Sequence, residues 1–175
     1  MKKILLLTTV LILVSVLGFS QNDRFWSVNN QSRANIARTK AVARLSYPKE
    51  FRLFNLNAAA IRQELLSIVD RSSRHAAIIT LPNADGKLEQ FEVVESSNFE
   101  PVLQARFPQI RAYSGKGITD KYAILKLSIS PQGIQTMVFR TDKDDEFIEP
   151  FSADHTVYSV FRSCLLYTSP SPRDS

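Results

Sequence analysis

Hydrophobic and polar residues alternate in several short runs between residues 78 and 161, as they do in β-strands with one buried face. Residues 78–81 and 88–93 flank a segment that contains Asp85 and Gly86, a pair that favours a tight hairpin turn. Alternation over residues 122–129 is followed by a turn at 130–133 and by another apolar run that ends at Phe139. This pattern predicts an antiparallel meander, with residues 115–117 in a loop before it.

Two helices and three further strands are expected around this meander. Asn57 can cap a helix, and Pro101 suits the first turn of a short helix that reaches residue 106. The strands are expected at residues 51–56, 146–149 and 157–161, and the aliphatic residues on one side of the first helix are Ile61, Leu65, Ile68 and Val69. The sequence therefore predicts an α+β fold, a mainly antiparallel sheet of meander and hairpins with one amphipathic helix packed on one face.

The amino terminus has the pattern of a secretory signal peptide. Lys2 and Lys3 precede an apolar run over residues 4–17, and small residues follow it, so we expect cleavage between Ser20 and Gln21. The apolar run is shorter than the roughly 20 residues that cross a bilayer, so a transmembrane anchor is the weaker interpretation. We expect an exported protein, secreted or at the cell surface, with no stable membrane span after cleavage.

The carboxyl terminus resembles a translated adapter sequence from a DNA library. These are residues 164–175, and they include the single cysteine, Cys164. We expect this tail to be non-native and the natural chain to continue beyond Ser163. The expected organisation is a signal peptide at 1–20, a partly helical leader at 21–48, one α+β domain at 49–163 and the non-native tail.

Charge gives little support to nucleic-acid binding. Without the signal peptide and the tail, 19 of the 22 basic and 16 of the 17 acidic residues remain, a net charge of +3. A basic arm for nucleic acid or a membrane surface is one interpretation of the early segment, but a solvated helix face or flexible leader is favoured because no aromatic residues interleave for base stacking. The basic residues gathered there are Arg33, Arg38, Lys40 and Arg44.

Metal-binding patterns are incomplete in this sequence. His75 and His155 are not followed by the residues of a His-Glu-x-x-His motif, and ordinary histidines are the favoured interpretation. An acidic run resembles the start of a calcium loop, yet Phe147 stands where that loop requires glycine. A solvated acidic turn is favoured for this run, which consists of Asp142, Asp144, Asp145 and Glu146.

Catalytic and cofactor patterns are also incomplete. Gly115 and Gly117 begin a glycine-rich segment, but Asp120 replaces the third glycine of a dinucleotide fingerprint. Neither Ser114 nor Ser130 has a base whose proximity can be read from the sequence. We therefore assign no catalytic, cofactor-binding or metal-ligating residue to this fragment.

Four short sequences carry a resemblance to a known family. They are residues 82–87 (PNADGK), 97–101 (SNFEP), 107–113 (FPQIRAY) and 130–137 (SPQGIQTM). Together they resemble the amino-terminal pro-segment of secreted, reprolysin-like (metzincin) zinc metalloproteases of Bacteroidetes, loosely from about residue 25 to residue 162.

The resemblance implies a function without catalysis in this part of the chain. The pro-segment would assist folding and keep a downstream catalytic domain latent, that domain would be its partner, and zinc would bind there. The intact precursor would be a zinc metalloendopeptidase. Without Cys164, the pro-segment has no thiolate to block the zinc. The alternative is an exported β-rich binding or interaction domain.

Overall fold

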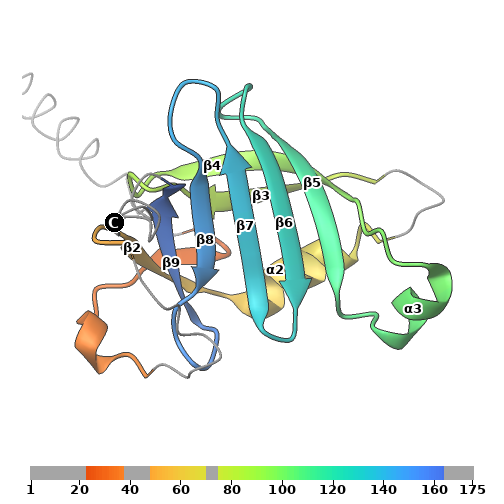
Figure 1. Cartoon of the computed structure of the whole chain (residues 1–175), viewed down its shortest axis with the longest axis horizontal. Helices are drawn as coiled ribbons and strands as arrows, with labels where there is room; N and C mark the ends of the chain where they lie inside the picture. Colours follow the sequence, from red (N-terminus) through yellow and green to blue (C-terminus); the bar gives the residue numbers. More distant parts are fainter. Residues whose placement is uncertain (1–22, 38–47, 70–74, 164–175) are drawn as a thin grey trace, which may run out of the picture.

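In the described part of the chain, a nine-stranded antiparallel sheet curls around the longer of two α-helices (Figure 1). The computed structural model describes residues 23–37, 48–69 and 75–163. The helices are a 3-10 turn at Arg33–Asn35, α2 at Ala58–Leu66 and α3 at Pro101–Arg106. The strands are β1 (Trp26–Val28), β2 (Arg52–Leu56), β3 (Ala77–Pro82), β4 (Leu88–Glu95), β5 (Arg111–Gly117), β6 (Ile124–Ser130), β7 (Gly133–Phe139), β8 (Glu146–Pro150) and β9 (Val157–Arg162).

The strand order explains how the sheet encloses its core. Strands β3 to β9 form a continuous meander, β2 pairs with β9, and β1 pairs with β2, so β1 and β3 are the two edges. The edges approach each other, because the indole nitrogen of Trp26 in β1 donates to the carbonyl of Thr80 in β3 at 2.8 Å. The predicted α+β fold with a mainly antiparallel sheet is confirmed.

Helix α2 fills the inside of the curled sheet. Ile61 and Leu65 are fully buried against the inner face. Asn57 caps the helix as predicted, since its side-chain oxygen accepts from the amide of Ala60 at 3.2 Å. The Tyr113 hydroxyl on β5 donates to the carbonyl of Leu65 at 3.1 Å and fixes the helix end to the sheet.

The sheet begins earlier in the chain than the expected domain boundary at residue 49. Strand β1 lies within the predicted leader, where Phe25 and Trp26 are buried in the main core. The Trp26 ring packs edge-on against Tyr158 at 5.6 Å between centroids. The predicted signal peptide with Ser20 and Gln21, the tail at 164–175, and Arg38, Lys40 and Arg44 lie outside the described residues.

The predicted loop at residues 115–117 is wrong, because these residues belong to strand β5. A Cβ atom on Gly115 would lie 2.8 Å from the side chain of Val93 in β4. A Cβ on Gly117 would lie 1.9 Å from the carbonyl oxygen of Asp120. Glycine is used here for close packing within a strand, where the sequence alone favoured a turn.

A buried ion-pair network closes one end of the sheet, and Arg140 is its centre. The Arg140 side chain is 1% exposed and follows β7. Its guanidinium binds Glu89 of β4 at 2.7 Å, Asp120 of the β5–β6 loop at 2.8 Å and Glu146 of β8 at 2.5 Å. Burial acts to lower the pKa of Arg140, but the hydrogen bonds that Arg140 donates to Glu89 and Glu146 outweigh it and raise the pKa above its ordinary value.

We expect Arg140→Ala to lower the free energy of unfolding by about 3–5 kcal/mol, because it leaves buried carboxylates without their cation. Chemical denaturation of the purified chain measures the loss. The control is Arg24→Ala, which removes the exposed Arg24–Glu64 pair and should lower stability by no more than about 1 kcal/mol. Equal losses in the two variants would contradict the central role of Arg140.

A second prediction concerns alkaline stability. Burial and then the charge of Glu95 raise the pKa of Tyr113 from 10.0 to about 12, against the opposite effect of Arg111. Since the folded-state pKa lies above the unfolded one, the protonated phenol contributes stability that is complete below pH 10.0 and is lost as the pH rises through about 12. In a pH titration followed by the ultraviolet absorbance of tyrosinate, the Tyr113→Phe variant should lack one tyrosine that ionises near pH 12 in the wild type. A tyrosinate titration identical to that of the wild type would refute the assignment.

Candidate functional site

His75 and His155 lie in different parts of the fold. His75 precedes β3 and is exposed, whereas His155 lies in the turn between β8 and β9 with φ of 57°. Within residues 23–37, 48–69 and 75–163, no three side chains of His, Cys, Asp or Glu are grouped so that they could hold a metal ion. The histidines therefore define no site in the described part of the chain.

The acidic run divides between solvent and the interior. Asp142 and Asp144 are exposed, in agreement with the predicted solvated turn. Glu146 instead points inward to Arg140, and the Asp145 carboxylate accepts from the backbone amide of Arg140 at 3.1 Å. The carboxylates diverge, so the calcium interpretation gains no support.

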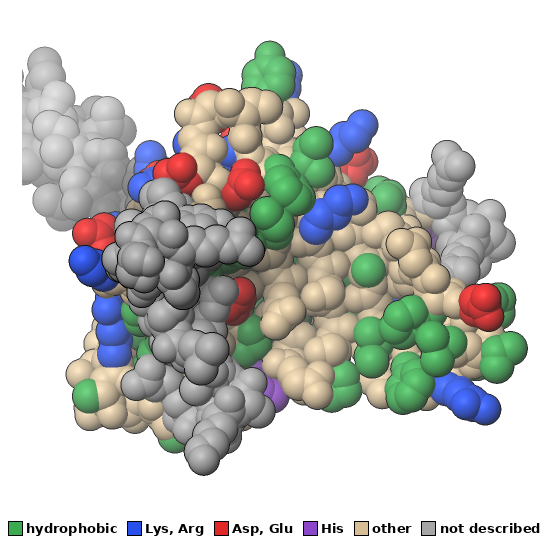
Figure 2. Space-filling view, viewed as in Figure 1, with side chains coloured by type: hydrophobic (Ala, Val, Ile, Leu, Met, Phe, Trp, Pro, Cys, Tyr) green, Lys and Arg blue, Asp and Glu red, His purple; other side chains and the backbone are tan. Residues whose placement is uncertain are grey.

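The outer face of strands β5 to β8, which points away from the core, carries exposed apolar side chains among its polar ones. Ile124 and Phe139 lie opposite each other on β6 and β7, with exposed fractions of 50% and 38%. Met137 lies opposite the half-buried Phe147. Figure 2 shows apolar side chains gathered over the upper parts of β6 and β7 beside basic ones.

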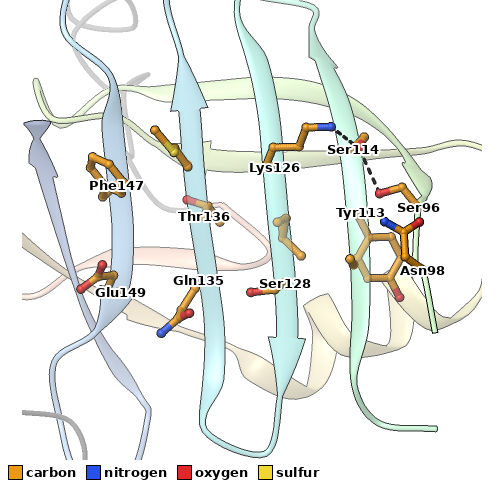
Figure 3. A pocket seen from close by; sticks show the side chains of 13 residues that line it. Ser96, Asn98, Tyr113, Ser114, Lys126, Ser128, Gln135, Thr136, Phe147 and Glu149 are labelled. Atoms are coloured by element: carbon orange, nitrogen blue, oxygen red, sulfur yellow. Dashed lines mark hydrogen bonds between the residues drawn. The ribbon is translucent and has the colours of Figure 1, made fainter. Parts of the chain in front are cut away.

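A groove of about 450 Å³ crosses this face, and we call it the outer groove (Figure 3). Lys126, Ser114 and Ser96 line one end, and Phe147 and Glu149 line the other. Its middle is lined by the outward side chains of two adjacent strands, Ser128, Gln135 and Met137.

A chain of hydrogen bonds fixes the basic end of the outer groove. The Lys126 ammonium donates to the Ser114 hydroxyl at 2.9 Å, and that hydroxyl donates to Ser96 at 2.9 Å (Figure 3). Lysines that act as general bases are desolvated by burial, but Lys126 is exposed. The arrangement therefore suits the binding of a carboxylate or carbonyl oxygen better than the activation of a serine.

Sequence reasoning missed this cluster because it depends on strand register. Ser114 and Lys126 are direct partners across β5 and β6. The sequence placed residues 115–117 in a loop, so it did not predict the β5–β6 register that pairs these two residues. The other candidate serine, Ser130, donates to the side chain of Gln132 at 3.0 Å in the β6–β7 turn. Ser130 therefore serves the turn.

Helix α3 forms a second exposed surface. It lies at one end of the molecule, away from the core, and its apolar side chains are visible there (Figures 1 and 2). Val102, Leu103 and Phe107 are 71%, 41% and 42% exposed. The buried residue of the helix is polar, since Gln104 donates to the carbonyls of Phe107 and Ile110 at 3.0 Å each. The helix thus turns the Gln104 side chain inward and its apolar side chains outward. An ordinary surface helix has the opposite arrangement.

Comparisons of this chain with protein-family models, curated proteins and solved structures find no match. Among the described residues, no helix combines the length and apolarity needed to cross a membrane.

Proposed function

We propose that this domain is the pro-segment of an exported zinc metalloprotease precursor, which assists folding of the downstream catalytic domain and keeps it latent. The proposal rests on the four short sequences that resemble such pro-segments. The observation that carries it is the apolar surface of α3, which lies between two of these sequences.

Two of the four sequences have roles inside the domain. In residues 82–87, the Asn83 side chain accepts from the amides of Asp85 and Lys87 at 3.0 and 2.9 Å, and Gly86 adopts φ of 88°. In residues 130–137, Gly133 adopts φ of 110°, and a Cβ there would lie 2.7 Å from the Tyr158 hydroxyl. These residues form turns, and folding alone explains their use.

The other two sequences, residues 97–101 and 107–113, lie at the two ends of α3, and folding does not explain the exposed apolar residues there. Val102 and Phe107 present apolar surface to solvent. Exposed apolar clusters on a folded domain mark contacts with other proteins. We therefore assign α3 as the element that contacts the catalytic domain.

The proposed mechanism is packing of α3 into an apolar depression of the catalytic domain. Addition of a strand at a sheet edge is less suited, because the edges β1 and β3 lie beside each other, joined by the Trp26–Thr80 hydrogen bond. Covalent connection raises the effective concentration of the two domains to roughly millimolar, so a weak contact suffices for latency. Zinc would be bound by the catalytic domain, and its blocking group would be a carboxylate, a histidine or a residue beyond Ser163.

We expect the folded chain, added in trans, to inhibit the mature protease, and Val102→Asp to weaken this inhibition about tenfold, or roughly 1.4 kcal/mol of binding free energy. The matched control is Ile78→Asp, a change at an exposed aliphatic residue on β3 that should leave inhibition unchanged. Inhibition constants and thermal melts of both variants provide the measurement.

Two results would overturn the proposal. Zinc-dependent casein cleavage by this chain alone would show that it is itself an enzyme. A folded chain with no effect on the folding or activity of the protease would favour the alternative, an exported binding domain without catalysis.

A further prediction concerns the gene. We expect genomic DNA to continue in frame past the codon for Ser163 and to encode His-Glu-x-x-His followed by a third histidine, the ligand set of a metzincin-type zinc site. Sequencing of the locus tests this. A stop codon soon after Ser163, or a downstream domain of another class, would contradict it.

A further inference from the structure

A pocket of about 390 Å³ lies at the start of strand β2, and we call it the basic pocket. Its charged lining residues are the cations Arg33, Lys49, Arg52 and Arg162 and the anions Glu50 and Asp85. Arg162 is neutralised by its ion pair with Asp85. Arg33, Lys49 and Arg52 form no ion pair within the described residues, so the basic pocket keeps an excess of positive charge.

The guanidinium of Arg33 is held in place by uncharged groups. Its Nη2 donates to the carbonyl of Phe51 at 3.0 Å, and its Cζ lies 3.9 Å from the centre of the Phe51 ring. A cation over an aromatic face is stabilised by the electron-rich ring. The remaining N–H groups of Arg33 have no hydrogen-bond partner in the described part of the chain, so they are available to a ligand.

The guanidinium of Arg52 is held in a similar way beside the β3–β4 turn. Its Nε donates to the carbonyl of Ala84 at 3.1 Å. The side chain lies against Gly86, where a Cβ atom would lie 3.3 Å from Cδ and 3.4 Å from Nη1 of Arg52. Both guanidiniums are therefore fixed without being neutralised, and a ligand that binds them does not first have to order them.

A second pocket of about 290 Å³ adjoins the basic pocket and shares Arg33, Phe51 and Arg52 with it. We call it the amide pocket, because Asn30 and Gln31 also line it. Their exposed side chains have no hydrogen-bond partner among the described residues. A side-chain amide can both donate and accept, which suits a ligand hydroxyl group. The two pockets thus place donors for an oxyanion next to groups that suit hydroxyls.

We propose that the basic and amide pockets together bind a saccharide that carries sulfate or phosphate groups. Arg33 and Arg52 donate to the oxyanion, since the planar fork of a guanidinium matches such groups, and Asn30 and Gln31 bind neighbouring hydroxyls. Glu50 lines the basic pocket and repels the ligand. None of these residues belongs to α3, so the proposal stands or falls independently of the pro-segment function.

The test is isothermal titration calorimetry of the purified chain with sucrose octasulfate at physiological ionic strength. We expect binding of this probe, no binding of sucrose, and weaker binding of inorganic sulfate. The double variant Arg33→Gln with Arg52→Gln should bind sucrose octasulfate about tenfold more weakly or worse. Glu50→Gln should bind it more tightly, because the variant removes the opposing charge.

The matched control is Lys121→Gln with Lys143→Gln, which removes two positive charges at exposed positions outside both pockets. This variant should bind as the wild type does, because charges that are far from the ligand are screened by salt. Asn30→Ala with Gln31→Ala should weaken binding of sucrose octasulfate and leave that of inorganic sulfate unchanged. Dextran sulfate and dextran phosphate of equal charge density then show which oxyanion is preferred.

Circular dichroism and thermal melts confirm that each variant is folded. A wild type that does not bind sucrose octasulfate, or that binds inorganic sulfate equally well, would overturn the proposal. Equal losses in the arginine and lysine double variants would do the same, since they would reduce the binding to attraction by net charge. A Glu50→Gln variant that binds no better than the wild type would place the ligand outside the basic pocket.

Discussion

The buried guanidinium of Arg140 is the constraint on which the shape of the sheet depends. A cation at 1% exposure is tolerated only with well-placed anions, and its three carboxylates come from β4, from the β5–β6 loop and from β8. The network extends further, since Glu89 also accepts from the buried side chain of Asn83 at 2.7 Å. The β3–β4 turn is thereby fixed to strands across the closed end of the sheet.

The inside of the sheet shows the complementary constraint. Polar contacts hold helix α2 at its middle and at its carboxyl end. The Arg62 side chain donates to the carbonyl of Ser130 at 2.5 Å, and the Tyr113 hydroxyl donates to the Leu65 carbonyl. Ile61 and Leu65 of the same helix have no exposed surface. Apolar packing fills the interior, while hydrogen bonds set the position of the helix within it. The exposed apolar side chains on α3 and on the outer face take no part in this core.

Local chemistry made most of the fold predictable from the sequence. Period-two alternation located the strands of the meander, Asp85 with Gly86 located a hairpin, and Asn57 located the start of α2.

The features that the sequence did not predict have long-range causes. Gly115 resembles a turn residue until the neighbouring Val93 is known, and Trp26 resembles part of a leader until its contacts with Thr80 and Tyr158 are known. Arg140 binds partners 51, 20 and 6 residues away, and no local pattern records such spacings. The outer groove was hidden for the same reason, because it depends on strand register.

The position of β9 has a consequence for the order in which the molecule assembles. This strand is the last of the described strands to be synthesised, yet it lies between β8 and β2 and joins the early hairpin of β1 and β2 to the meander. Until β9 is made, β2 lacks one of its two partner strands and Trp26 lacks the ring of Tyr158. Contacts between distant parts of a chain form slowly, since the entropy of closing the loop must be overcome before they stabilise anything. The early strands β1 and β2 thus join the meander only once β9 is made, so the sheet closes around α2 late in synthesis.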